Sequence, residues 1–221
     1  MKKNFSLFLF FLSIYNYYIF FNWYLSDQKI IIEDAMFLAL NASISLYAFI
    51  FITHIYFFPK NVNESAKIIT FPPLILLFSI NTGLLIGTTN MYYLQLYEIS
   101  NLFNILRSKH IGVLLIIISL FVLFSALNEF KRNNEDPMPT TKSKFLILTK
   151  IYKFTRNPMY LGMLIFQFGL GMSLSFIHIV FLTPITFYIF HKYIIIREEQ
   201  YLEKKFGMDY QRYKSQVRRW L

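Results

Sequence analysis

Residues 159–196 read MYLGMLIFQFGLGMSLSFIHIVFLTPITFYIFHKYIII, which is two apolar blocks with a short break at residues 175–178. Each block approaches the roughly 20 residues that an α-helix needs to cross the hydrocarbon core of a bilayer. Only helices satisfy the backbone polar groups of such segments in lipid, and the break leaves room only for a tight turn. The stretch therefore predicts an antiparallel helical hairpin within an all-α, polytopic integral membrane protein.

The remainder of the chain supports the same fold class. The 221 residues are 56% hydrophobic, with a mean hydropathy of +0.44. Long apolar blocks of this kind belong in lipid. We predict about six transmembrane helices, at approximately residues 5–25, 35–58, 68–88, 111–130, 159–176 and 179–196. Pro72 and Pro73 should delay or kink the third of them, because proline disrupts the interior of a helix.

The basic residues are concentrated around the hairpin. The formal net charge is +10, and residues 131–158 hold seven Lys and Arg against two Asp and Glu, while residues 197–221 hold seven against four. Basic segments between apolar blocks fix membrane orientation and meet anionic headgroups, so we expect no nucleic-acid partner. Both segments and both chain termini are predicted to face the cytoplasm, from the inner membrane of a bacterium or the endoplasmic reticulum of a eukaryote.

Metal and thiol chemistry find no support in the sequence. There is no cysteine, which excludes a thiolate ligand, a disulfide and a cysteine nucleophile. The four histidines, at positions 54, 110, 178 and 191, show no pairing at the spacing of a helical metal site. We therefore predict no metal site.

Two polar motifs flank the hairpin. RNPMYLG at residues 156–162 leads into its first helix, and Asn157-Pro158 is a typical helix start, with Asn as the cap and Pro in the first turn. EEQYLEKKFGMDYQRY at residues 198–213 and VRRW at residues 217–220 follow its second helix. A hairpin returns the chain to the same membrane face, so these motifs should wall one pocket at the interface. Taken singly, each motif is explained as well by a capped helix start or a solvated helix end.

The combination of motifs resembles the C-terminal core of the isoprenylcysteine carboxyl methyltransferase family and is also similar to phospholipid methyltransferases. NEFKR at residues 128–132 and PMP at residues 137–139 resemble the stretch that precedes the first motif in this superfamily. The resemblance divides the chain into an N-terminal unit of three helices, residues 1–110, and a methyltransferase core, residues 111–221. Within the core it implies a cofactor loop at residues 131–158 and a cytoplasmic helical tail at residues 197–221.

The resemblance implies S-adenosylmethionine as cofactor and a lipophilic acceptor that enters from the bilayer. By matching motif positions, it implies the cofactor-binding residues Tyr152, Arg156, Asn157, Pro158, Tyr160, Glu198 and Glu199, with Arg156, Asn157 and Glu198 also catalytic. It further implies that the tail acts as a lid and interfacial anchor through Arg197, Tyr210, Tyr213, Arg218 and Trp220.

The acceptor is less well defined. Many carboxyl methyltransferases have His where this chain has Asn157, and Gly is common where it has Ile151. An isoprenylcysteine-like carboxylate is the predicted acceptor, oriented by the fork of Arg156 or Arg197. A thiol and an aminophospholipid are the alternatives, and an amine would need Glu198 or Glu199 to accept its proton.

Two readings outside methyl transfer are open. An NADPH-dependent reductase of the sterol type shares a related C-terminal architecture, but such reductases have Trp at the position of Tyr210 and a Cys in the acidic motif. A non-enzymatic membrane protein would give the acidic pair no special role. The oligomeric state is left open by the sequence.

Overall fold

The computed structural model describes residues 2–26, 32–59 and 65–221, and within them the secondary structure is entirely helical. The α-helices are α1 (Lys2–Leu25), α2 (Ile32–Phe57), α3 (Pro72–Thr89), α4 (Lys109–Arg132), α5 (Pro158–Ser173), α6 (Ile177–Ile189), α7 (Ile196–Phe206) and α8 (Met208–Gln216). Short π-helical segments, η1 (Asn90–Leu94) and η4 (Phe190–Ile195), extend α3 and α6, and η2 (Asn101–Arg107) and η3 (Lys150–Lys153) are 3-10 turns. The predicted all-α fold class is confirmed.

Five helices in the described part of the chain are long and apolar enough to cross a membrane, which makes this a polytopic integral membrane protein. They are Lys2–Leu25, Asp34–Phe57, Pro72–Leu94, Lys109–Arg132 and Ile177–Phe206. The remaining predicted crossing, at residues 159–176, corresponds to α5, which has 16 residues. At 1.5 Å per residue it is about 24 Å long, shorter than the roughly 30 Å core of a bilayer. Its length is limited by Pro158 at its start and by the turn after Ser173.

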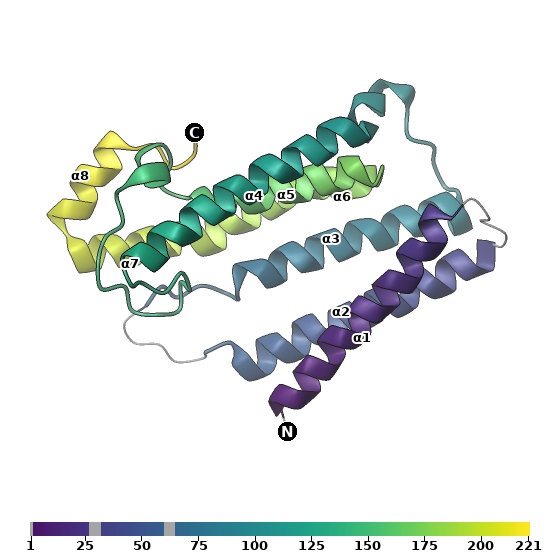
Figure 1. Cartoon of the computed structure of the whole chain (residues 1–221), viewed down its shortest axis with the longest axis horizontal. Helices are drawn as coiled ribbons and strands as arrows, with labels where there is room; N and C mark the ends of the chain where they lie inside the picture. Colours follow the sequence, from purple (N-terminus) through teal and green to yellow (C-terminus); the bar gives the residue numbers. More distant parts are fainter. Residues whose placement is uncertain (1, 27–31, 60–64) are drawn as a thin grey trace.

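The helices form two groups joined by α3 (Figure 1). Helix α4 packs along α5, and α5 pairs with α6 in the predicted tight hairpin, while α1 pairs with α2. Helix α3 contacts both α2 and α6 and so connects the groups. Where α4 crosses α5, a Cβ on Gly112 would lie 2.3 Å from the backbone nitrogen of Ser173 and 2.7 Å from the carbonyl oxygen of Gly169. Such close backbone approach requires glycine, as in many membrane helix pairs.

The polar residues within the spans hold helices together, as their position in lipid predicts. The side-chain amide of Gln167 donates to Ser79 Oγ at 2.9 Å and to the carbonyl oxygen of Ile179 at 3.2 Å. The amide of Asn81 donates to the carbonyl oxygen of Ser43 at 3.1 Å. These contacts tie α5 to α3 and α6, and α3 to α2.

The last crossing is longer than predicted. Helix α6 continues through η4 into α7 without a break, so Glu198 and Glu199 lie within a helix and not at its end. The continuous helix has 30 residues, about 45 Å, whereas some 20 residues cross the hydrocarbon core. Its apolar part ends at Ile196, and α7 projects beyond the membrane-spanning part with the acidic pair in its first turn. In Figure 1, α8 then turns back beside the segment that follows α4.

Candidate active site

A cavity lies where the start of α5, the first turns of α7, the segment after α4 and helix α8 meet. Its walls include all seven predicted cofactor-binding residues: Tyr152, Arg156, Asn157, Pro158, Tyr160, Glu198 and Glu199. The PMP stretch at residues 137–139 also lines it. The hairpin thus brings the two motifs together as predicted, while the role of each residue stays a prediction.

The predicted cofactor loop is held in place by a few specific contacts. The carboxylate of Glu135 accepts hydrogen bonds from the backbone amides of Lys144 at 2.7 Å and Phe145 at 2.6 Å. The hydroxyl of Tyr201 on α7 accepts one from the amide of Ser143 at 3.1 Å. These bonds fold residues 135–145 into a closed loop against α7, so the loop forms a wall of the cavity.

The carboxylate of Glu198 has one hydrogen-bond partner among the described residues. Tyr160 donates its hydroxyl proton to Glu198 Oε2 at 2.8 Å, and no other described residue hydrogen-bonds to this side chain. Burial raises the pKa of Glu198 to about 7, because the charged form loses hydration, while the bond from Tyr160 partly opposes the rise and the charge of Glu199 adds to it. The carboxyl group can therefore change its protonation state near neutral pH.

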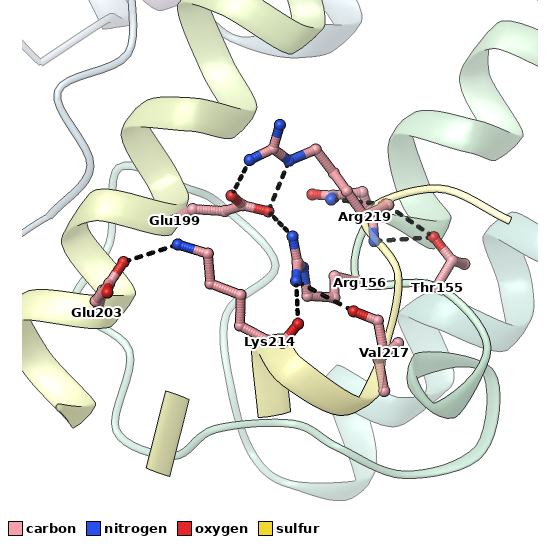
Figure 2. A network of polar contacts seen from close by, with 8 residues as sticks. Thr155, Arg156, Glu199, Glu203, Lys214, Val217 and Arg219 are labelled. Atoms are coloured by element: carbon pink, nitrogen blue, oxygen red, sulfur yellow. Dashed lines mark hydrogen bonds and ion pairs between the residues drawn. The ribbon is translucent and has the colours of Figure 1, made fainter. Parts of the chain in front are cut away.

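Glu199 is engaged within the protein. Its Oε1 accepts hydrogen bonds from Arg156 Nη2 at 2.9 Å and Arg219 Nε at 3.0 Å, and its Oε2 accepts one from Arg219 Nη2 at 2.6 Å. Burial alone would raise the pKa of Glu199, but the bonds from Arg219 and the charge of Arg156 outweigh it and hold the pKa below its usual range. Figure 2 shows the two guanidinium groups converging on this one carboxylate. Glu199 is thus an anion at neutral pH that pairs with Arg156 and Arg219.

Arg156 and Asn157 hold the C-terminal tail. Arg156 Nη1 donates to the carbonyl oxygens of Lys214 at 2.9 Å and Val217 at 3.1 Å, as Figure 2 shows. The side-chain amide of Asn157 donates to the carbonyl oxygen of Arg219 at 3.0 Å. Asn157 occupies the N-cap position of α5, but its side-chain oxygen accepts no hydrogen bond from the first turn of the helix. The prediction that Asn157 caps the helix is therefore wrong.

The tail residues divide into those that hold the tail and those that do not. Tyr210 is buried, and the Tyr213 hydroxyl donates to the carbonyl oxygen of Tyr152 at 2.7 Å. The Trp220 ring lies 5.0 Å from that of Phe187 on α6. Tyr213 and Trp220 thus hold the tail against η3 and α6, while the role of the tail as lid and interfacial anchor stays a prediction.

The two predicted tail arginines take other places. The side chain of Arg218 is exposed, and the inward guanidinium belongs to its neighbour Arg219, which sequence reasoning missed. Arg197 Nη1 donates to the carbonyl oxygen of Lys67, and Arg197 does not line the cavity. Two adjacent arginines in VRRW carry no signal for which one faces inward, since the segment after Gln216 is not helical.

Comparison with known proteins gives the chain its family. Residues 108–209 match the phospholipid methyltransferase family. The chain is 42% identical over 67 residues to an uncharacterized protein of Haemophilus influenzae, a match that covers 28% of this chain and all of that protein. It is 31% identical over 104 residues to the Δ14-sterol reductase LBR of Gallus gallus, covering 42% of this chain and only 16% of the reductase. No solved structure matches.

The family match begins at the start of α4 and extends into α8, so it contains the hairpin, the loop and most of the cavity wall. The first motif and the acidic pair both fall within it, and residues 1–107 and 210–221 lie outside it. Through residues 108–209, the chain belongs to the phospholipid methyltransferase family, a family of membrane methyltransferases.

Proposed function

We propose that the protein transfers the methyl group of S-adenosylmethionine to a lipophilic acceptor that reaches the cavity from the membrane. One observation carries the proposal: three acidic residues line the cavity, Asp136, Glu198 and Glu199, and although Glu199 is paired with Arg156 and Arg219, Glu198 forms no ion pair among the described residues. A wall of this kind attracts a cation and repels an anion.

S-adenosylmethionine fits such a wall. It carries a sulfonium and an ammonium charge, and when bound it supplies a methyl group already activated for displacement. Tyr152 and Tyr160 line the cavity beside the acidic residues, and aromatic faces favour cations close by. The chain's own task is to align the two reactants and exclude water, which is where the buried lining contributes most.

The engaged arginines bear on the acceptor. Recognition of a carboxylate by a guanidinium fork requires two donors that point at it. Arg156 directs Nη1 to two tail carbonyls and Nη2 to Glu199, which leaves only Nε without a partner among the described residues, and Arg197 lies outside the cavity lining. These contacts disfavour isoprenylcysteine-like O-methylation and favour an amine or a thiol. Such an acceptor must lose a proton, and Glu198, with a pKa of about 7, is suited to accept it.

The second candidate function is an NADPH-dependent reduction, favoured by the similarity to the sterol reductase. NADPH is a polyphosphate anion, and anion binding needs basic side chains or free backbone amides. The acidic lining argues against it, because the cavity has no unpaired cation among the described residues. A non-enzymatic role predicts neither cofactor.

The test uses membranes that contain the full-length protein and S-adenosylmethionine labelled in its methyl group. We expect label in the organic extract with the wild type, and at least a tenfold lower rate with Glu198→Gln, since one proton acceptor is worth about 10²–10⁴ in rate. Glu203→Gln is the matched control, because Glu203 lies on the same helix and does not line the cavity. Absence of labelled lipid together with NADPH oxidation would replace this proposal with the reductase.

A further inference from the structure

A second groove adjoins the cavity on the other side of Tyr201. It is lined by Ser65, Lys67, Arg197, Gln200, Tyr201 and Lys204. Tyr201 lies on the walls of both the groove and the cavity, but the two have opposite character. The groove carries three cations and no carboxylate, and neither the family match nor the proposed reaction accounts for it.

The three cations of the groove are Lys67, Arg197 and Lys204. Arg197 Nη1 donates to the carbonyl oxygen of Lys67 at 2.7 Å, which fixes the guanidinium beside the segment that leads to α3. Lys204 lies two helical turns further along α7 and also lines the groove. Among the described residues, no carboxylate forms an ion pair with Lys67, Arg197 or Lys204. Three like charges in one groove repel each other unless an anion lies between them.

Ser65 supplies an independent sign of a ligand. Its side chain is 7% exposed, it lines the groove, and its Oγ is buried with no hydrogen-bond partner among the described residues. A buried hydroxyl without a partner costs stability, and such groups usually mark a bound ion, water or ligand. A hydroxyl beside three cations is the donor set of a phosphate site.

The position of the groove along the membrane normal identifies the source of the phosphate. Arg197 directly follows Ile196, where the apolar part of the last crossing ends, and Lys67 precedes the start of α3 at Pro72. The groove therefore lies at the depth of the lipid headgroups. Basic pockets at this depth bind the headgroups of anionic lipids.

We propose that this groove binds the phosphate of an anionic membrane phospholipid, at a site separate from the methyl-transfer cavity. Lys67, Arg197 and Lys204 neutralise the phosphate, and Ser65 donates a hydrogen bond to it. The inference does not depend on the proposed function, because none of these four residues lines the cavity.

The test measures binding to the detergent-purified, full-length protein through the shift of its melting temperature. Short-chain phosphatidylglycerol is titrated beside short-chain phosphatidylcholine and inorganic phosphate. We expect saturable stabilisation by phosphatidylglycerol, and binding about tenfold or more weaker in Lys67→Gln/Lys204→Gln, since each basic residue near a membrane surface contributes about 1 kcal/mol. Ser65→Ala, which barely changes volume, should weaken binding severalfold and leave the ligand-free protein folded.

Lys131→Gln/Lys153→Gln is the matched control, because it removes the same charge from exposed positions in the loop of residues 131–158, outside the groove. Equal weakening in the control and the groove variant would reduce the effect to general electrostatic attraction and overturn the site. Equal affinity for phosphatidylcholine would overturn the preference for an anionic lipid. Equal affinity for inorganic phosphate would overturn the lipid as its source.

Discussion

Replacing Glu199 by Gln should release the C-terminal tail from the start of α5. The side chains of Glu199 and Arg156 are 7% and 8% exposed, while that of Arg219 is 30% exposed. Removing one partner of a buried ion pair costs about 3–5 kcal/mol, and the partial exposure of Arg219 places the expected cost near the lower limit, about 3 kcal/mol. Glutamine keeps the shape of the side chain but leaves two guanidinium groups without a counter-charge.

The local cost can be read by amide hydrogen exchange of the protein in nanodiscs. The backbone amide of Arg156 donates to the carbonyl oxygen of Arg218 at 3.0 Å, so exchange at Arg156 reports opening of the tail. A loss of about 3 kcal/mol corresponds to about a hundredfold faster exchange, at 1.4 kcal/mol per factor of ten. Amides in the middle of α4 should exchange as in the wild type, because the network does not reach them.

Glu203→Gln is the control for this prediction. Glu203 lies one turn after Glu199 and pairs with Lys214 at 3.1 Å, but the side chains of Glu203 and Lys214 are 34% and 40% exposed. Exposed ion pairs contribute little to stability, so exchange at Arg156 should rise by no more than about fivefold. Equal acceleration by the two variants would refute the claim that the buried network, and not general surface charge, holds the tail.

Three further predictions concern packing, the backbone and pH. Gly112→Ala should lower the melting temperature of the detergent-purified protein by several degrees, because its Cβ would meet the backbone of α5; an unchanged value would disprove the close crossing. Gly207→Ala should lower the free energy of unfolding by about 1–3 kcal/mol through backbone strain alone, since φ is 52° and no atom lies within 4 Å of the new Cβ. Chemical unfolding measures this loss, and an unchanged stability would contradict the strained turn. Because the pKa of Glu198 is raised to about 7, its carboxylate forms as pH rises through 7, and the methyl-transfer rate should rise with it. Tyr160→Phe removes a hydrogen bond that lowers this pKa, so the midpoint of the pH–rate profile should move upward. A midpoint that stays in place would show that the pH dependence does not come from Glu198.

The sequence predicts the helical elements well because lipid leaves few alternatives. Apolar blocks of about 20 residues must be helices, and Pro72 and Pro158 mark the starts of α3 and α5. The short break before Ile177 permits only a tight hairpin, which places the RNP motif and the acidic pair on one face. The hairpin and the meeting of the two motifs follow from local chemistry, whereas the seven predicted lining residues follow from the family resemblance.

The partners of the site residues could not be predicted, because they depend on how distant segments pack. The π-helical segment η4 continues α6 into α7, and no periodicity in the sequence marks it. Glu198 and Glu199 are adjacent in the sequence, yet one contacts Tyr160 and the other two arginines, since neighbouring residues point in different directions from a helix. Arg219 was missed because the segment after Gln216 is not helical, so no periodicity shows which of the two adjacent arginines faces inward.

Isothermal titration of the detergent-purified protein with S-adenosylhomocysteine measures occupation of the proposed cofactor site. We expect saturable binding by the wild type, clear weakening in Glu198→Gln as the acidic wall loses a charge, and unchanged binding in Glu203→Gln. Well-folded wild-type protein that binds no S-adenosylhomocysteine, or that binds NADPH in its place, would contradict the proposed function.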